Sequence, residues 1–263
     1  MAIAVYLEDL EDKVKKSIVE ELMVSSKADF MGYGKNVDIY PYSVDGNVVY
    51  LPFYYGNQKL AQYPNDQRQF TRREMKFQGE LRDYQKDVVK EAVARLNAVR
   101  CIFLSMATGK GKTFTGIYLA TLLKVKVCVL LYRSKLFEQW EKSLKNAIPG
   151  VKIQTLDSRE PLDPDTDFYL INPDVAVKRN KADFEDIGLL IADEAHVMCS
   201  EKRSKCLLHF TPKWCIGLSA TPERSDMLEQ IIYLHFGTYQ INVPLWVDHD
   251  YYKFATKLVP PDK

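Results

Sequence analysis

The sequence predicts an α/β protein in which a mostly parallel β-sheet is covered by helices on both faces and preceded by a small α+β unit. From about residue 79 onward, short continuous apolar runs alternate with longer amphipathic runs, which is typical of parallel strands buried between helices. Earlier in the chain, an Asp-Gly pair separates two β-rich runs and predicts a hairpin. The composition is 46% hydrophobic and 27% charged over 263 residues, which is that of a globular protein and excludes a disordered or fibrous chain.

The small α+β unit is expected within the first 60 residues. Apolar residues recur at helical spacing over residues 5–24, so an amphipathic helix is expected there. A hairpin is expected around Asp45-Gly46, and Pro41 and Pro52 favour edge positions for its two strands. The stretch from Gly56 to Thr71 is polar and loop-like, and it marks the expected boundary between this unit and the rest of the chain.

The remainder of the chain predicts alternating helices and strands. Helices are expected at residues 79–96, 112–123 and 134–147, where apolar residues share one helical face. Buried strands are expected at residues 101–106, 126–132, 151–156, 167–172, 188–193 and 214–220. The five cysteines lie mostly in these apolar runs, which predicts buried, reduced thiols. A zinc set of Cys199, Cys206, His209 and Cys215 could be drawn, but its spacing fits no common site.

The overall charge and hydropathy exclude some functions. Lys and Arg total 36 against 35 Asp and Glu, so any surface that binds nucleic acid has to be local. No apolar run approaches the roughly 20 residues that cross a bilayer. The chain turns acidic directly after its first residues, unlike a secretory signal peptide. We therefore expect neither a membrane partner nor secretion.

A phosphate-binding loop is predicted between an apolar strand and an apolar helix. Glycines there let successive backbone N–H groups point at one anion, next to the positive end of a helix. Lys112 is expected to reach the β- and γ-phosphates, and the Thr113 hydroxyl to bind Mg²⁺. Met106 stands where the strict pattern has its first glycine; the alternative is a chance surface turn. The expected nucleotide-binding residues are Thr108, Gly109, Lys110, Gly111, Lys112 and Thr113.

An acidic pair completes the predicted site. Asp193 and Glu194 follow a buried apolar strand, at the end where ligands bind in open α/β sheets. Asp193 suits a Mg²⁺ ligand, and Glu194 suits the group that orients and deprotonates an attacking water. A solvated acidic strand end is the alternative for such a pair alone. Because it follows Lys112 by 81 positions in the same series of strands and helices, the two half-sites together predict an ATPase.

These motifs together resemble superfamily 2 helicases of the DEAH type, and within that superfamily the XPB-like branch found in phages and large DNA viruses. The resemblance spans roughly Phe77 to Gly237, in the order LRDYQ, ATGKGKT, LLYRSKLFEQW, IADEAH and GLSATPER. It implies a RecA-like P-loop NTPase domain, ATP and Mg²⁺ as cofactors, and DNA or RNA as partner. It also implies a cytoplasmic or nuclear location, a viral factory or virion included.

The resemblance assigns roles to further residues near the nucleotide. Gln85 would pair with the adenine edge, because an amide can donate and accept at once, and Arg82 would stack on the base. His196 would act with the catalytic residues and link the nucleotide site to the segment that couples hydrolysis to strand movement. That coupling segment is Ser219, Ala220 and Thr221. For Arg82 and Gln85 the alternative is an ordinary polar helix start. For the coupling segment the alternative is an ordinary loop or helix cap.

A nucleic-acid contact is implied at the start of the 134–147 helix. The residues that match this motif of the family are Arg133, Ser134, Lys135 and Gln139; Ser and Lys at a helix start suit backbone phosphates. Trp140 is expected in the core rather than as a stacking platform. Asn172 stands where the family carries a threonine-bearing contact, and it is a weaker candidate. Val197 departs from a histidine that often follows the DEAH motif.

The expected domains are a small α+β unit over 1–70, a RecA-like ATP-binding domain over 71–245, and a linker over 246–263. The family has a second RecA-like domain that supplies arginine fingers, and no motif for it follows residue 224. The sequence is therefore expected to be the N-terminal half of a helicase, with the second domain in cis or in trans.

Two other functions and two other surfaces remain open. The chain could be a non-catalytic module that docks nucleic acid or a polymerase, or a duplex translocase that does not separate strands. Six aromatic residues of the expected hairpin favour packing over base stacking: Tyr40, Tyr42, Tyr50, Phe53, Tyr54 and Tyr55. A basic stretch of Lys59, Arg68, Arg72, Arg73 and Lys76 could meet phosphate, but a solvated face is the default.

Overall fold

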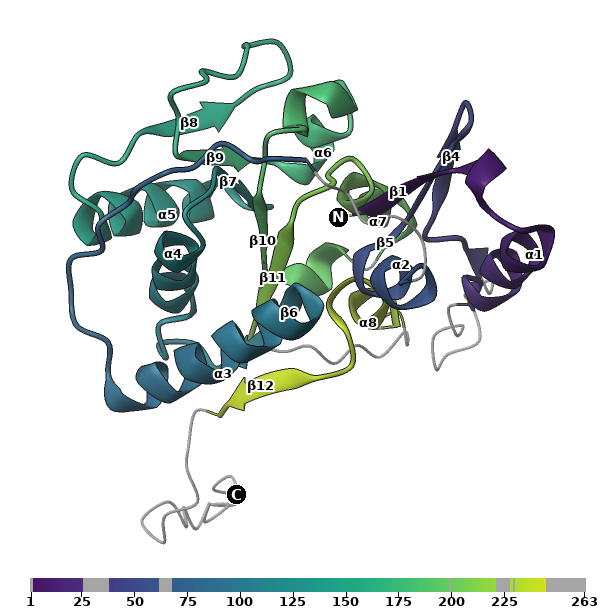
Figure 1. The fold of residues 1–263 in the computed structure, drawn as a ribbon. Helices are drawn as coiled ribbons and strands as arrows, with labels where there is room; N and C mark the ends of the chain where they lie inside the picture. The colour runs from purple at the N-terminus through teal and green to yellow at the C-terminus, as the bar shows by residue number, and fades with distance from the viewer. Residues whose placement is uncertain are drawn as a thin grey trace, which may run out of the picture.

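The structure, a computed structural model, describes residues 2–25, 38–61, 68–198, 200–220, 228 and 230–244. A three-stranded and a seven-stranded sheet form its framework, with a two-stranded ladder beside the smaller one. Figure 1 shows the smaller sheet at one side of the molecule and the larger sheet at its centre.

The N-terminal unit is built on an antiparallel sheet in the order β1-β5-β4. Its strands are β1 (Ala2–Tyr6), β4 (Ser43–Asp45) and β5 (Val48–Pro52). Asp45 pairs with Val48, so the turn is the two residues Gly46 and Asn47, and Gly46 has the positive φ of 58° that such tight hairpins use. The predicted hairpin is confirmed. The remaining elements of the unit are η1 (Leu7–Asp9), α1 (Asp12–Glu21), β2 (Val24–Ser25), β3 (Asp38–Ile39) and α2 (Phe53–Lys59).

Two sequence predictions for this unit are wrong. The helix expected over 5–24 begins only at Asp12, because Ala2–Tyr6 pair with β5 as a strand whose burial alternates. The strand containing Pro52 is the central strand of the sheet and not an edge. Pro52 is tolerated there because it is the last residue of β5, where the sheet gives way to α2.

The expected loop from Gly56 to Thr71 and the expected aromatic hairpin are also corrected. Phe53, Tyr54 and Tyr55 lie on α2. Gly56 lies inside the same helix, where a Cβ would come within 2.8 Å of Ile3 Cβ, so the glycine lets α2 pack closely on β1. The packing interpretation is confirmed for Phe53, which is buried.

The large sheet is entirely parallel, with the order β12-β6-β11-β10-β7-β9-β8. Its strands are β6 (Cys101–Met106), β7 (Val127–Leu130), β8 (Ile153–Leu156), β9 (Phe168–Ile171), β10 (Leu189–Asp193), β11 (Trp214–Ser219) and β12 (Gln240–Val243). The central strands are buried on both faces, which explains why they read as continuous apolar runs.

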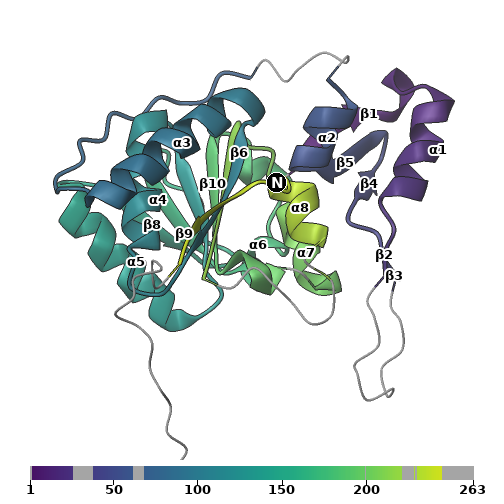
Figure 2. The same ribbon diagram turned by 90° about the horizontal axis from the view of Figure 1, so that it is seen from below.

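Helices cover both faces of this sheet, as predicted. One face carries α3 (Asp83–Val99), α4 (Lys112–Leu123) and α5 (Ser134–Ala147). The other carries α6 (Pro173–Ala176), η2 (Lys181–Phe184), η3 (Ala195–Met198), α7 (Glu201–Leu207) and α8 (Gln230–Phe236). Figure 2 shows the two layers on either side of the sheet, with the N-terminal unit on the α8 side.

The sequence located the first of these layers well and missed part of the second. The helices expected at 112–123 and 134–147 have those bounds, and the first helix begins at Asp83 rather than residue 79. The short helices α7 and α8 and the edge strand β12 were not anticipated. Each has seven residues or fewer, too few to show a periodic pattern above its surroundings.

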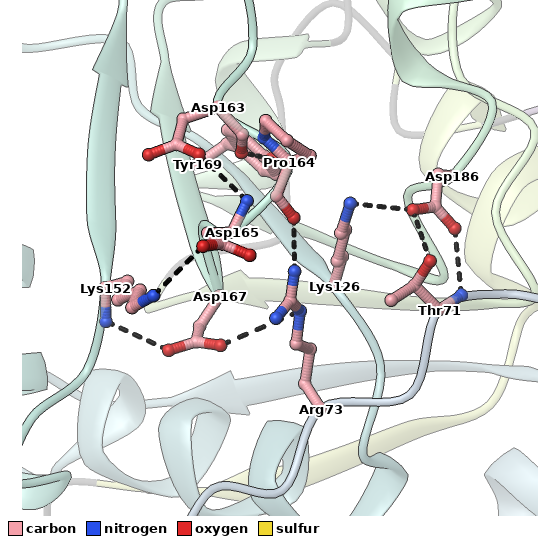
Figure 3. Close-up of polar contacts among 10 residues, drawn as sticks. All are labelled: Thr71, Arg73, Lys126, Lys152, Asp163, Pro164, Asp165, Asp167, Tyr169 and Asp186. Carbon is pink, nitrogen blue, oxygen red and sulfur yellow. Dashed lines mark hydrogen bonds and ion pairs between the residues drawn. The ribbon is translucent and has the colours of Figure 1, made fainter.

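A polar cluster fastens the segment before α3 to the edge of the large sheet where its strands begin (Figure 3). Asp186 accepts hydrogen bonds from the Thr71 backbone N–H at 2.9 Å and hydroxyl at 2.7 Å, and its carboxylate lies 2.8 Å from the Lys126 ammonium. Two steps along the segment, the Arg73 guanidinium lies 3.9 Å from Asp167 and also donates to the Pro164 carbonyl. Arg73, which the sequence placed in a basic stretch, therefore has a structural role.

Four of the five cysteines lie among the described residues, and all four are buried thiols as predicted. Cys101, Cys128, Cys206 and Cys215 are free and buried, and burial raises the pKa of the Cys101 and Cys206 thiols to about 12. Cys199 lies outside the described residues. Within the described part of the chain, no set of three or more His, Cys, Asp or Glu side chains could hold a metal ion. No described helix has the length and apolar character needed to span a bilayer.

The Asp186 cluster predicts a pH-dependent contribution to stability. Burial raises the pKa of Asp186, but hydrogen bonds from Lys126 and Thr71 outweigh it and hold the pKa below its ordinary 3.8. Its contribution is therefore full above pH 3.8 and is lost as the pH falls through the lower folded-state pKa. Asp186→Asn should cost about 1–2 kcal/mol at pH 7, because it leaves the largely buried Lys126 ammonium unpaired, and less below pH 3.8.

Urea unfolding of the two proteins at pH 7 and near pH 3 measures this. Asp165→Asn is the matched control from the same cluster, since its partner Lys152 and Asp165 itself are both more than half exposed and such pairs contribute little. An Asp186→Asn protein as stable as wild type at pH 7, or equally weakened at both pH values, contradicts the assignment.

The close packing around Gly217 in the central strand β11 predicts that one added methyl group lowers the stability of the protein. A Cβ at Gly217 would lie 2.7 Å from the Phe103 ring and 3.1 Å from the Phe236 ring. Gly217→Ala should therefore destabilise the protein by about 1–3 kcal/mol through overpacking, measured as a lower melting temperature. Adding Phe103→Leu should recover part of the loss, because the smaller side chain vacates the contact. No recovery in the double variant would show that the contact with Phe103 is not the cause.

Candidate nucleotide and nucleic-acid site

The predicted phosphate loop joins β6 to α4 at the carboxyl edge of the large sheet. Gly109 and Gly111 have φ values of 81° and 78°, the left-handed conformation that glycine adopts without strain. The Lys110 backbone N–H donates to the Ala107 carbonyl at 3.1 Å, closing a turn. Lys112 and Thr113 then begin α4, at the end of a helix where backbone N–H groups are unpaired and attract anions.

Side chains from the start of α3 support this loop. Gln85 is buried, and its amide nitrogen lies 3.5 Å from the Lys110 carbonyl and 3.3 Å from the Thr115 hydroxyl. The Tyr84 hydroxyl donates to the same carbonyl at 3.0 Å, and Arg82 donates to that hydroxyl at 3.1 Å. In the structure, Gln85 and Arg82 therefore lie at the loop; their contacts with adenine stay predictions.

The acidic pair ends β10 at the same edge of the sheet. Asp193 is 3% exposed. Its carboxylate accepts hydrogen bonds from the Trp140 indole at 2.7 Å and from the Glu194 backbone N–H at 3.0 Å. Burial raises the pKa of Asp193, and the Glu194 charge adds to that rise, while Trp140 and the Lys112 charge oppose it. A buried carboxylate held in this way is oriented by its neighbours.

Glu194 connects the two half-sites. The Lys112 ammonium lies 3.9 Å from its carboxylate, and the His196 Nδ1 lies 3.5 Å from the other oxygen. The same His196 nitrogen is 2.8 Å from the Ser219 hydroxyl at the end of β11. Glu194 itself has a φ of +50°, an uncommon conformation for a residue with a side chain. Residues from β6–α4, β10 and β11 thus meet at one place.

The residues present are suited to Mg²⁺ and a triphosphate. Mg²⁺ keeps several waters and takes one or two protein oxygens together with phosphate oxygens, and Asp193 with Thr113 supplies a carboxylate and a hydroxyl. The Lys112 charge acts on Asp193, so the lysine and the carboxylate lie in one site. The Lys112 side chain is 12% exposed, which strengthens its attraction for phosphate relative to a lysine in open solvent.

The expected nucleic-acid residues lie at one exposed helix start. Arg133 precedes α5, and its neighbours Ser134 and Lys135 form the first turn; all three are exposed, as is Gln139. Asn172 lies next to this helix start: its side chain donates to the carbonyl of Tyr132, the residue before Arg133, at 3.2 Å and caps α6 by accepting from Asp174 N–H at 2.8 Å. This structural role leaves a nucleic-acid contact by Asn172 a prediction.

Three residues of this site were missed or only partly understood from the sequence. Trp140 is fully buried, as the core interpretation expected, but its hydrogen bond to Asp193 was not anticipated. Tyr84 and Thr115 support the phosphate loop through Gln85 and Lys110. No local pattern marks these partners, since each contact joins positions more than 20 residues apart. Within the coupling segment, Ser219 and Ala220 follow one another at the end of β11, and Thr221 lies outside the described residues.

Comparisons with known proteins agree with the resemblance. Residues 78–224 match the family described as Type III restriction enzyme, res subunit. The protein named "Putative helicase 109L" of Invertebrate iridescent virus 3 is 30% identical over 266 residues, which are 95% of this chain and 80% of that protein. The DNA 3'-5' translocase XPB2 of Sulfurisphaera tokodaii is 32% identical over 150 residues, which are 56% of this chain and 32% of the translocase.

A comparison of folds agrees with the predicted fold. The UvsW helicase from bacteriophage T4 superposes with a TM-score of 0.57 at 17% identity, over 87% of this chain and 93% of the crystallised chain. At this identity the likeness concerns the fold. The predicted α/β fold of the RecA-like kind is confirmed.

An added methyl group is predicted to lower nucleotide affinity more at Gly111 than at Gly109. Both have a positive φ, so either alanine variant carries strain of about 1 kcal/mol. A Cβ at Gly111 would also lie 2.5 Å from the Gln85 amide nitrogen, whereas a Cβ at Gly109 meets no atom within 4 Å. Gly111→Ala should therefore weaken binding of a fluorescent ATP analogue roughly tenfold more than Gly109→Ala. Equal effects in the titrations would contradict the support of the loop by Gln85.

Proposed function

The chain belongs to the superfamily 2 helicase family that includes the Type III restriction enzyme res subunits, and from this membership we propose that it is the ATP-binding part of a motor that moves along or unwinds nucleic acid. The single observation that carries the proposal is the ion pair between Lys112 and Glu194 at 3.9 Å. It joins residues of two motifs that lie 82 positions apart at the edge of the sheet where ligands bind in this class of fold.

The phosphate loop binds and orients the triphosphate. Backbone N–H groups at the Lys112–Thr113 start of α4 would face the phosphates. Lys112 would leave Glu194 to pair with the phosphate oxygens, which carry more negative charge. Thr113 and Asp193 would hold Mg²⁺, which would supply positive charge against the charge that develops on the transferred phosphoryl group. Arg82 and Gln85 hold the base beside α3.

Glu194 then acts on water. Once Lys112 is drawn to the phosphates, the Glu194 carboxylate is free to accept a proton from the attacking water. His196 lies beside this carboxylate, since its Nδ1 is 3.5 Å from Glu194 and 2.8 Å from the Ser219 hydroxyl. This contact also gives a route from the nucleotide to the segment Ser219, Ala220 and Thr221, which we propose couples hydrolysis to movement.

The start of α5 contacts the nucleic acid. Arg133, Ser134 and Lys135 offer charged, hydroxyl and backbone donors for phosphates, with Gln139 one turn further on. DNA is favoured because the archaeal relative is named a DNA translocase; RNA is the alternative. A duplex translocase that does not separate strands would use the same residues, and strand displacement on forked and blunt duplexes distinguishes the two.

We assign residues 1–70 to an N-terminal domain, 71–245 to the ATP-binding domain and 246–263 to a linker. A second RecA-like domain, in cis or in trans, completes the cleft and supplies arginine fingers, which can be worth roughly 10³–10⁵ in rate. A cytoplasmic, nuclear or virion location suits such a motor.

Nucleotide binding and hydrolysis by this chain test the proposal. The chain alone should bind a fluorescent ATP analogue weakly and hydrolyse ATP slowly, with or without single-stranded DNA, because half of the cleft belongs to the second domain. Lys112→Ala should lower the affinity at least roughly tenfold, since it removes a charge-assisted contact with phosphate. Glu194→Gln should keep binding and lose the remaining hydrolysis.

Lys90→Ala is the matched control, because Lys90 is an exposed lysine of α3 outside the site; it should bind as wild type does. Unchanged binding by Lys112→Ala would contradict the proposed site. If Lys112→Ala also left the protein's biological function intact, the docking module would be the correct function. Strong DNA-stimulated turnover and unwinding by the monomer would contradict the need for a second domain.

A further inference from the structure

Trp140 is a buried side chain that joins the helix with the predicted nucleic-acid contact to both halves of the nucleotide site. Its indole N–H donates to Asp193 at 2.7 Å. Its ring lies beside α4, the helix that begins with Lys112, since a Cβ at Gly116 would be 3.7 Å from its Cη2 atom. The ring is fully buried, so its position is set by α4, α5 and β10 together.

The hydrogen bond from Trp140 holds the Asp193 carboxylate in one orientation. Asp193 is 3% exposed, and a buried carboxylate without donors is costly. One oxygen accepts the indole and the other accepts the Glu194 N–H at 3.0 Å. Each carboxylate oxygen can accept a second partner, so both remain able to bind a metal or a water while the group cannot rotate.

Trp140 lies on the same helix, α5, as the residues predicted to contact nucleic acid. Ser134 and Lys135 at the exposed start of this helix precede Trp140 by less than two turns, and all three lie on one continuous helix of 14 residues. A force on that start is therefore transmitted to the indole, and the indole holds Asp193.

We propose that Trp140 is a positioning residue: it orients the Asp193 carboxylate for Mg²⁺ and connects occupation of the α5 start by nucleic acid to the nucleotide site. This rests on the proposed function, because it takes Asp193 as a metal ligand and α5 as a nucleic-acid contact. It goes beyond that function by giving a role to a residue that touches neither ligand.

The first experiment measures Mg²⁺ dependence and not turnover. Trp140→Phe keeps an aromatic ring and removes the donor. Binding of a fluorescent ATP analogue in EDTA should stay within about twofold of wild type, while the Mg²⁺ concentration that gives half of the Mg²⁺-dependent gain in affinity should rise about tenfold, the size expected for a lost hydrogen bond to a charged group. Trp214→Phe is the control, because Trp214 begins β11 and Ser219, at the other end of this strand, lies in the site. This variant should not change the Mg²⁺ midpoint.

A structural role alone would lower the melting temperature of Trp140→Phe and leave its Mg²⁺ midpoint unchanged, which would overturn the proposal. If Trp140→Phe does not fold, β-(3-benzothienyl)alanine at position 140 replaces the N–H by sulfur with nearly the same ring shape. A wild-type Mg²⁺ midpoint in that protein overturns the proposal equally. Failure of the wild-type chain to bind nucleotide at all would instead contradict the proposed function.

The second experiment follows Trp140 itself. In the double variant Trp214→Phe and Trp246→Phe, Trp140 is the remaining tryptophan of the sequence. Adding oligo(dT) without nucleotide should shift its emission, and Lys135→Ala should reduce the shift and the affinity together. Binding of labelled oligo(dT) that leaves the Trp140 emission unchanged would overturn the connection between α5 and Asp193.

Discussion

The parallel order of β6, β11 and β10 is the constraint on which the candidate site depends, and the ion pair between Lys112 and Glu194 forms across it. Lysine follows β6, and glutamate follows β10, with β11 between the two strands. Because all three strands are parallel, their ends reach the same edge, and residues distant in sequence converge there. Ser219, at the end of the intervening strand, receives the His196 contact, so the three strand ends form one continuous polar site.

Buried side chains beneath the site hold its ligand-binding residues in place. Gln85 supports the phosphate loop through Lys110, and Trp140 supports Asp193. Both side chains are buried, and buried polar groups stabilise one arrangement because any other leaves them unpaired. A loop of glycines and a pair of acids would otherwise have many conformations, so this supporting layer accounts for a site formed before a ligand arrives.

The opposite edge of the sheet has a different task, which is to attach the N-terminal unit and the segment that follows it. The Ala2 backbone N–H donates to the Phe210 carbonyl at 2.7 Å, and the Arg68 guanidinium donates to the Thr211 carbonyl at 2.6 Å. The Lys181 ammonium lies over the Tyr50 ring, and the Asp186 cluster holds Thr71. Ligand chemistry and attachment thus occupy opposite ends of the same strands, so insertions at one end need not disturb the other.

The sequence by itself determined the elements whose signals are local. The apolar runs of the large sheet, the helices at 112–123 and 134–147, the Asp45-Gly46 turn and the paired motifs at Lys112 and Asp193 were all predicted, because periodicity, turn residues and motif spacing act within a few residues. Only the tertiary structure decided that residues 2–6 form a strand, since that depends on pairing with β5, 42 to 50 positions away in the hydrogen-bonded register. It also decided that Trp140 serves Asp193 and that Arg73 serves Asp167: such partners are chosen by packing between distant segments, which no local pattern encodes.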